Sequence, residues 1–278
     1  MAEQVAPKRS LVIRGLDRWG AFWLERLSLL GAVYYLIQDV ATWIVRSMVN
    51  PRVRFGRTAL VTQLVRVGVR ATFIVMLVCG SVGLILALQM EPTLSEYGQT
   101  DLIANVVGVG ITRELGPLIA AIVLTGFAGA AIAAELGTMV VGEEIEALEA
   151  HALNPIRFLV VPRVCATVIG LILLTVIADV TAILAGGFVS VTFLGVPYEL
   201  YKSNTLTSID VQDFLTGLIK AGVFGLIMSA LACYHGLNVT GGAAGVGRAT
   251  TATVVQAVVA VIIADLLFTT VFYNIGWA

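Results

Sequence analysis

The chain has 278 residues, of which 58% are hydrophobic and only 13% are charged, with a formal net charge of −1. A soluble globular enzyme of this length needs more polar surface than such a composition supplies, so the sequence predicts an integral membrane protein. The charges are unevenly distributed, because eleven of the seventeen Lys and Arg residues fall within the first 70 positions.

The amino-terminal region differs from the rest of the chain. Between Leu11 and Val49, the apolar core covers only residues 27–37 and is bracketed by charged residues and by tryptophans. We expect an amphipathic helix that lies in the headgroup region; the alternative is a sixth, weakly apolar span. Residues 1–62 are therefore predicted to form a cytoplasmic arm with this interfacial helix, and residues 63–278 to form a five-span membrane domain.

Five further segments have the roughly 20 apolar residues that a helix needs to cross a bilayer. The sequence thus predicts an all-α membrane protein with an interfacial helix and five transmembrane helices. With the basic amino terminus in the cytoplasm, the positive-inside rule places the carboxyl terminus outside and leaves Lys202 as the basic residue of the outer loops. The five segments are residues 71–90, 115–134, 164–185, 214–234 and 252–273.

The start of the second span carries charges and helix-breaking residues. Arg113 and Glu114 are followed closely by Gly116 and Pro117, and we expect a break there because proline removes a backbone hydrogen bond. Adjacent helical residues point about 100° apart, so the two charges are not expected to neutralise each other. Charges at membrane depth usually face a cavity or a partner, which makes this group a candidate gate or lipid path. The alternative is that both charges lie at the outer headgroup boundary.

Three other carboxylates, those of Glu135, Asp179 and Asp265, lie within or at the ends of apolar segments. They either sit at a membrane boundary or line a polar path. Small residues also recur at intervals of four along the second span, which permits close approach between helices. Packing within the chain is the simpler interpretation, and a homodimer seam is the alternative. These helix-packing candidates are Gly126, Gly129, Ala133 and Gly137.

An acidic amphipathic segment, residues 143–154, separates the second and third spans. Its apolar positions repeat at helical spacing, and the Asn154–Pro155 pair is predicted to end the helix. It is longer than a minimal turn, so we expect a cytoplasmic coupling helix on which a partner protein acts; the alternative is an ordinary solvated connection. The candidate coupling residues are Glu143, Glu144, Glu146, Glu149, Asn154 and Pro155.

Several familiar motifs are incomplete in this chain. Residues 242–249, GAAGVGRA, have Arg248 and Ala249 where a phosphate-binding loop needs lysine and a hydroxyl side chain. His151 and His235 are isolated, so we expect no metal site, and no spacing suggests a catalytic set. We expect no cofactor bound by this chain and no nucleic-acid partner; the basic arm is typical of contact with anionic lipid.

Five stretches together resemble the MlaE/YrbE permeases of MCE-type lipid ABC transporters. The resemblance implies a homodimeric permease of the bacterial inner membrane that moves phospholipid or another lipid between that membrane and the cell envelope. It also implies two cytoplasmic ATPase subunits that use ATP and Mg, and a ring of MCE-domain lipid-binding proteins outside. The stretches are RELGPLIAAIVLTG, AGAAIAAELGTM, EEIEALE, NPIRFLVVPR and CYHGLNVTGGAAGVGRATTATVV.

The same resemblance places the acidic segment on the family's coupling region and Arg113–Pro117 on its first signature. Phe127 stands where many members have an arginine that could contact a lipid head group, so cargo preference is expected to differ here. Two other functions compete with a lipid permease. One is an ATP-independent secondary transporter that uses Asp179, Glu135 or Asp265 as a proton site, although no inverted repeat is visible. The other is a membrane scaffold that moves no lipid.

Overall fold

The computed structural model describes residues 11–49 and 57–276. These residues fold into helices, as predicted, and the chain is an all-α integral membrane protein. Six helical stretches among them are long and apolar enough to cross a membrane. Five of these contain the five predicted spans, and the sixth lies in the amino-terminal helix. The elements are α1 (Leu11–Val49), α2 (Arg57–Glu96), η1 (Thr100–Leu102), α3 (Ile103–Gly110), η2 (Ile111–Leu115), α4 (Gly116–Leu124), η3 (Thr125–Gly129), α5 (Ala130–Val141), α6 (Glu144–Ala150), η4 (Ile156–Val160), α7 (Val161–Thr192), α8 (Tyr198–Ser208), α9 (Val211–Leu237) and α10 (Gly242–Ile275).

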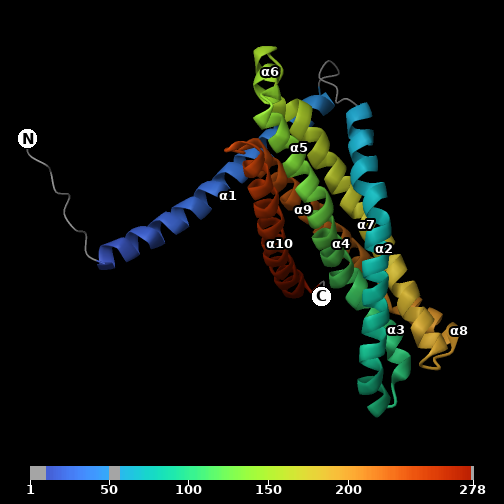
Figure 1. Cartoon of the computed structure of the whole chain (residues 1–278). Coiled ribbons are helices and arrows are strands. Elements are labelled where there is room, and N and C mark those ends of the chain that lie inside the picture. The colour runs from blue at the N-terminus through green and yellow to red at the C-terminus, as the bar shows by residue number, and fades with distance from the viewer. Residues whose placement is uncertain (1–10, 50–56, 277–278) are drawn as a thin grey trace, which may run out of the picture.

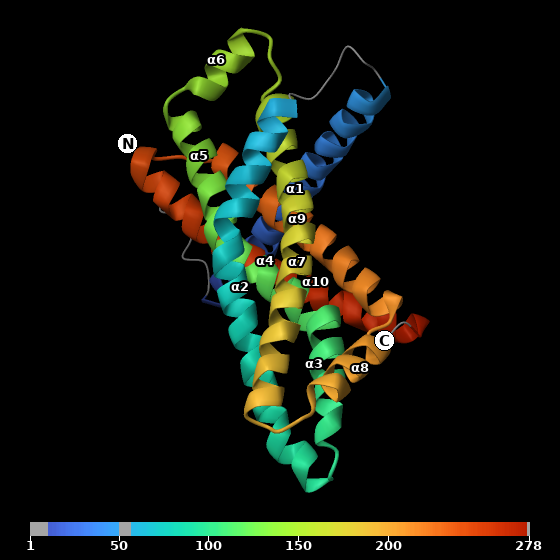
Figure 2. The same cartoon turned by 90° about the vertical axis from the view of Figure 1, so that its right-hand side faces the viewer.

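Helix α9 lies at the centre of the bundle and α10 at its edge. Among the 18 most apolar consecutive residues of each helix, 56% are buried in α9 but only 11% in α10. Helices α2 and α7 run side by side along the bundle (Figures 1 and 2). They approach closely at Gly83, where an added Cβ would lie 2.0 Å from the carbonyl oxygen of Ala182. The absence of a side chain at Gly83 therefore lets the backbones of α2 and α7 meet, and α10 presents most of its apolar surface outward.

The second span is interrupted twice by π-helical turns. Before Pro117, the Gly116 amide donates to the Ile111 carbonyl, five residues earlier, because the helix must adjust to the N–H that proline lacks. The regular hydrogen-bond pattern is therefore interrupted at the predicted position, although the helical stretch continues through Pro117. A second π turn, η3, ends with the Ala130 amide bonded to the Thr125 carbonyl. No proline marks that turn, and the sequence did not indicate it.

Helix α1 slants away from the bundle toward the amino terminus (Figure 1). Only 6% of its most apolar window is buried, and Val40 is its one residue buried in the hydrophobic core among those whose side chains are described. Near its end, the Arg157 guanidinium lies 5.5 Å from the Trp43 ring centroid. The slant favours the predicted interfacial helix. Residues 26–47 are nevertheless apolar enough to cross a membrane, so the interfacial placement of α1 stays a prediction.

The predicted helix over residues 143–154 is shorter in the structure. Helix α6 covers Glu144–Ala150, because Glu143 and Ala152 adopt left-handed backbone angles, with φ of 59° and 58°. Asn154 does not end this helix: its Oδ1 accepts a hydrogen bond from the Arg157 amide and so caps the next one. Glu143, Asn154 and Pro155 therefore flank α6. The helix itself stands at the extreme end of the bundle (Figure 1).

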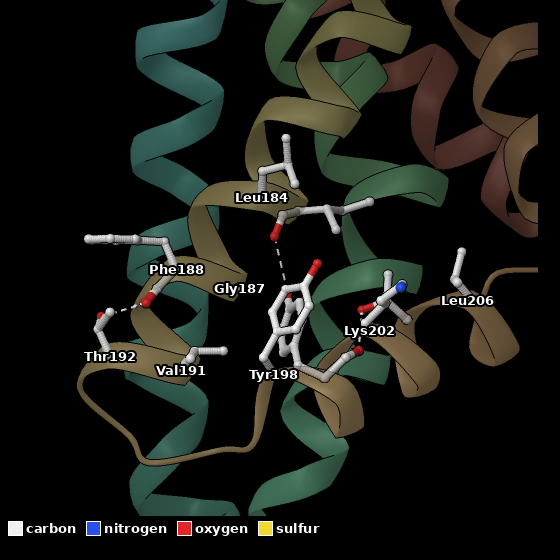
Figure 3. Close-up of a pocket in the computed structure, with 11 residues that line it drawn as sticks. Leu184, Gly187, Phe188, Val191, Thr192, Tyr198, Lys202 and Leu206 are labelled. Carbon is white, nitrogen blue, oxygen red and sulfur yellow. Dashed lines mark hydrogen bonds between the residues drawn. The ribbon is translucent and has the colours of Figure 1, made fainter.

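At the opposite end, residues 198–208 form a helix, α8, where the sequence indicated only a loop. The Tyr201 ring packs on Gly187, where an added Cβ would lie 2.7 Å from the ring, and its hydroxyl donates to the Ile183 carbonyl at 3.1 Å. Burial raises the pKa of Tyr201 to about 12. Between α7 and α8 lies an apolar cavity of about 460 Å³, with Tyr198 and Lys202 on its α8 side (Figure 3).

Candidate functional site

A buried group of charges joins the second span to α9 and α10. The Lys220 ammonium lies 2.6 Å from Glu114 Oε2, 2.9 Å from Asp265 Oδ1 and 2.9 Å from Thr269 Oγ1. Its side chain is 1% exposed, and a lysine ammonium has three N–H groups to donate. The Thr269 hydroxyl also contacts Glu114 Oε1 at 2.9 Å. We call Glu114, Lys220, Asp265 and Thr269 the lysine cluster.

The residue before Glu114 has a separate partner. Arg113 Nε donates to Asp213 Oδ1 at 2.5 Å, and Asp213 also caps the start of α9 by accepting from the Asp210 amide. Lys220 lies seven residues further along α9, which is about 10 Å along the helix. The prediction that Arg113 and Glu114 do not neutralise each other is confirmed, because each pairs with a different residue of α9.

The lysine cluster lies at membrane depth and is partly accessible. Lys220 is the tenth residue of the 27-residue α9, so it lies well inside a span. The Glu114 side chain is 36% exposed and that of Asp265 is 13% exposed. An apolar bundle that carries such ion pairs usually does so for function, because burying charges is costly even when they are paired. The cluster therefore places an ionic group inside the apolar bundle, with the Glu114 carboxylate as its most accessible member.

A second ionic group lies nearer the α6 end. Glu135 on α5 contacts Arg66 Nη1 of α2 at 2.6 Å and Arg163 Nη2 of α7 at 3.1 Å. The Arg163 side chain is 6% exposed, whereas that of Arg66 is 49% exposed. Glu135 thus ties three helices together immediately before the chain reaches α6.

Asp179 has a different environment from the other predicted carboxylates. It is 3% exposed, and neither of its oxygens has a hydrogen-bond partner among the described residues. It packs on the backbone of the second span, where an added Cβ at Gly116 would lie 1.7 Å from Asp179 Oδ1. Of the three carboxylates considered for a proton site, Glu135 and Asp265 are ion-paired and Asp179 is not.

The predicted helix-packing residues divide into two faces. An added Cβ at Gly129 would contact Thr253 and Met228 at ordinary distances, and Ala133 is fully buried. Gly137 packs against Val239, in the connection between α9 and α10, and against Val246 of α10. Gly126 is exposed and has nothing within 4 Å of a Cβ position. Packing within the chain is therefore observed for three of the four, and Gly126 lies on an open face.

Phe127, inside the second span, and the carboxylates of α6 are both exposed. Phe127 is 37% exposed and lines a cavity together with Arg66 and Arg70 of α2. Glu144, Glu146 and Glu149 of α6 are exposed and make no ion pair within the described part of the chain.

Three residues of these ionic groups, Lys220, Asp213 and Arg66, were not predicted from the sequence. A single lysine in an otherwise apolar span is a signal that could have identified Lys220. Its partners lie 106 and 45 residues away along the chain, so the sequence alone could not pair them.

Comparison with known proteins agrees with this architecture. Residues 60–271 match the family model described as Permease MlaE. A "Probable ABC transporter permease protein" of Rickettsia bellii is 36% identical over 231 residues, covering 83% of this chain and 88% of the relative. One from Synechocystis is 31% identical over 94% of this chain and 96% of its own length.

A third relative has a more specific name. The "Intermembrane phospholipid transport system permease protein MlaE" of Haemophilus influenzae is 31% identical over 228 residues, which cover 82% of this chain and 87% of that protein. The family model covers most of the chain: the first four predicted spans, the fifth as far as residue 271, α6 and all four residues of the lysine cluster. The chain therefore belongs to the MlaE permease family.

Proposed function

We propose that this permease subunit of an ABC lipid transporter moves phospholipid, or a closely related lipid, between the bacterial inner membrane and the cell envelope. The family membership and the name of the Haemophilus influenzae relative support that cargo. The chain itself is non-catalytic in this proposal. A separate cytoplasmic ATPase subunit hydrolyses ATP with Mg, and an MCE-domain protein receives or delivers the lipid outside.

The observation that carries the proposal is the geometry of α6. Helix α6 carries three exposed glutamates and lies at the end of the bundle (Figure 1), while α5, which leads into it, is fixed by the ion pairs of Glu135 to α2 and α7. A force applied to α6 by a basic surface on the ATPase subunit would therefore pass into the spans. A solvated connecting loop would not need both an acidic face and a rigid attachment.

The π turns offer places where the second span can respond. Such turns are frequent at functional sites because they weaken the regular hydrogen-bond pattern. Turn η3 lies between Glu135 and the lysine cluster, and η2 contains Glu114 itself. Lipid movement requires different contacts in two states. In this proposal, the α6 helices of two copies of the chain move together, and this motion repacks α4 and α5 around a lipid cavity that the lysine cluster lines.

Two copies of the chain form the functional permease in this proposal. Gly126 lies on an open face of the second span, and α10 exposes most of its apolar surface. Small exposed residues permit close approach of a second copy. Glu114 is accessible from outside the chain, so a dimer interface here would enclose the lysine cluster.

The proposed orientation places α6 and the amino terminus in the cytoplasm and α8 outside. The basic amino-terminal residues support it through the positive-inside rule. The MCE-domain protein then meets the end of the bundle that carries α8, and the ATPase subunit meets the end that carries α6.

Neutralising α6 tests the proposal. A variant with Glu144→Gln, Glu146→Gln and Glu149→Gln removes three exposed charge contacts of about 0.5 kcal/mol each, which corresponds to about tenfold weaker docking of the ATPase subunit. We expect lipid transfer in reconstituted vesicles to fall by about that factor, while the ATPase subunit alone hydrolyses ATP normally and the variant's unfolding temperature is unchanged.

A charge-matched control neutralises Glu91, Glu96 and Glu199 at the opposite end of the bundle. It should leave ATPase docking unchanged. Unchanged docking and transfer in the α6 variant, or equal loss of docking in the control, would contradict the role of α6.

A further inference from the structure

A cavity of about 350 Å³ lies between α2 and the second span, separate from the lysine cluster. Helix α2 contributes Gln63, Arg66 and Arg70 to its lining, and the second span contributes Phe127, Ala131 and Glu135. It therefore combines ionic groups with an apolar wall.

The lining changes from ionic to apolar along the membrane direction. Arg70 is the last charged residue of α2 before a charge-free stretch that extends through Met90, so it lies where that helix enters the apolar layer. Phe127 lies eight residues before Glu135, which is about 12 Å along the second span in the direction away from α6. A glycerophospholipid has the same polarity profile, because its phosphate lies at the membrane boundary and its acyl chains extend toward the centre.

The charges around the cavity do not balance. Glu135 is shared between Arg66, at 2.6 Å, and Arg163, at 3.1 Å. Arg70 is exposed and makes no ion pair with another described residue. One carboxylate thus faces three guanidinium groups, which leaves net positive charge at the ionic end. Guanidinium groups bind phosphate oxygens through paired N–H donors.

We propose that this cavity binds an anionic glycerophospholipid, with its phosphate on Arg70 and the outer side of Arg66 and with an acyl chain against Phe127 and Ala131. The inference rests on the proposed lipid function and names a lipid class for it. In this arrangement the positive charge of the cavity comes from Arg66 and Arg70 on α2, because Phe127 on the second span is uncharged. An anionic lipid is preferred to a zwitterionic one because the cavity carries excess positive charge.

Lipid binding to the purified full-length chain tests the proposal without requiring transport. Native mass spectrometry measures the fraction of chain that carries phosphatidylglycerol or phosphatidylcholine across a titration of each lipid. Arg70→Gln should weaken phosphatidylglycerol binding about tenfold, the effect of losing one charge-assisted hydrogen-bonding group, and should weaken phosphatidylcholine binding less. Lys202→Gln, a loss of one positive charge at the opposite end of the bundle, should change neither by more than about twofold.

A relocated charge gives a second, independent readout. Because Phe127 lines the same cavity as Arg70, Arg70→Gln combined with Phe127→Arg should recover most of the phosphatidylglycerol binding. A photoreactive phosphatidylglycerol should also crosslink to the α2 and second-span peptides that line the cavity. Soluble glycerol phosphate, which lacks acyl chains, should not compete at equal concentration, and full competition by it would overturn the assignment to a membrane lipid.

Three further outcomes overturn the inference. In the first, Arg70→Gln and Lys202→Gln weaken phosphatidylglycerol binding equally. In the second, Arg70→Gln weakens the binding of both lipids equally. In the third, Arg70→Gln abolishes a dimer seen by light scattering, which would show that a second copy of the chain fills the cavity. The proposed function fails in a different way. A chain that binds phosphatidylglycerol through Arg70 but moves no lipid with its ATPase contradicts the transport proposal and leaves this site intact.

Discussion

Replacing Lys220 with methionine tests the lysine cluster as a structural and functional unit. The substitution keeps the length of the side chain but removes the ammonium that lies 2.6 Å from Glu114 and 2.9 Å from Asp265. Two carboxylates then face each other in a buried position without the cation between them. Removing one partner of a buried ion pair costs about 3–5 kcal/mol. Because Glu114 is about one third exposed, water screens part of this loss, and we expect ~3 kcal/mol.

The loss is measurable as a change in the free energy of unfolding, by titrating the purified chain in mixed detergent and SDS micelles. The same change should lower the unfolding temperature by about 6–12 °C. Lys202→Met is the matched control, because Lys202 is exposed and makes no ion pair with a described residue; it should cost less than about 0.5 kcal/mol.

Neutralising the partners separates electrostatics from packing. Adding Glu114→Gln and Asp265→Asn to Lys220→Met removes the unpaired carboxylates, so more than half of the lost stability should return. A loss below about 1 kcal/mol in Lys220→Met, or no recovery on neutralising the carboxylates, would refute the view that the three charges stabilise one another.

Two further predictions concern packing and pH. Gly116→Ala should destabilise the chain by about 1–3 kcal/mol, because the new Cβ would meet the Asp179 side chain. Gly126→Ala, whose Cβ would have nothing within 4 Å, should be neutral or slightly stabilising. Similar unfolding temperatures for the two variants would contradict the observed packing at Gly116. Burial raises the pKa of Tyr201 to about 12, above the usual value of about 10 for a tyrosine. The neutral phenol therefore contributes its full stability below about pH 10, and this contribution is lost as the pH rises toward 12. Ultraviolet titration should show one late-ionising phenol that disappears in Tyr201→Phe, and an unchanged titration would show that Tyr201 is not buried.

The sequence was most informative where one physical requirement dominates. A helix that crosses a bilayer needs about 20 apolar residues, and all five predicted spans lie within observed helices. Pro117 lacks an N–H, and the backbone changes its hydrogen-bond pattern directly before it. A short helix between the second and third spans was also predictable, because Ile145 and Leu148 repeat at helical spacing in an acidic segment.

The sequence was least informative where distant residues decide the outcome. Glu114 and Lys220 are 106 residues apart, and nothing local distinguishes a paired charge from one at the membrane boundary. Helix α8 was missed because its polar composition resembles a loop and its position depends on Tyr201 packing over Gly187. The backbone angle of Glu143, which delays the start of α6, likewise has no sequence signal, since glycine or asparagine is the usual residue there.

Lipid transfer in vesicles that contain this chain, its ATPase subunit and an MCE-domain protein tests the central claim most directly. The measurement follows a fluorescent phospholipid between membrane and acceptor, with ATP, with a non-hydrolysable ATP analogue, or with an ion gradient alone. We expect transfer only with hydrolysable ATP and a marked decrease when Glu144, Glu146 and Glu149 are neutralised. Transfer driven by an ion gradient through the lone chain, or no ATP-dependent transfer with the complete set of partners, would contradict the account.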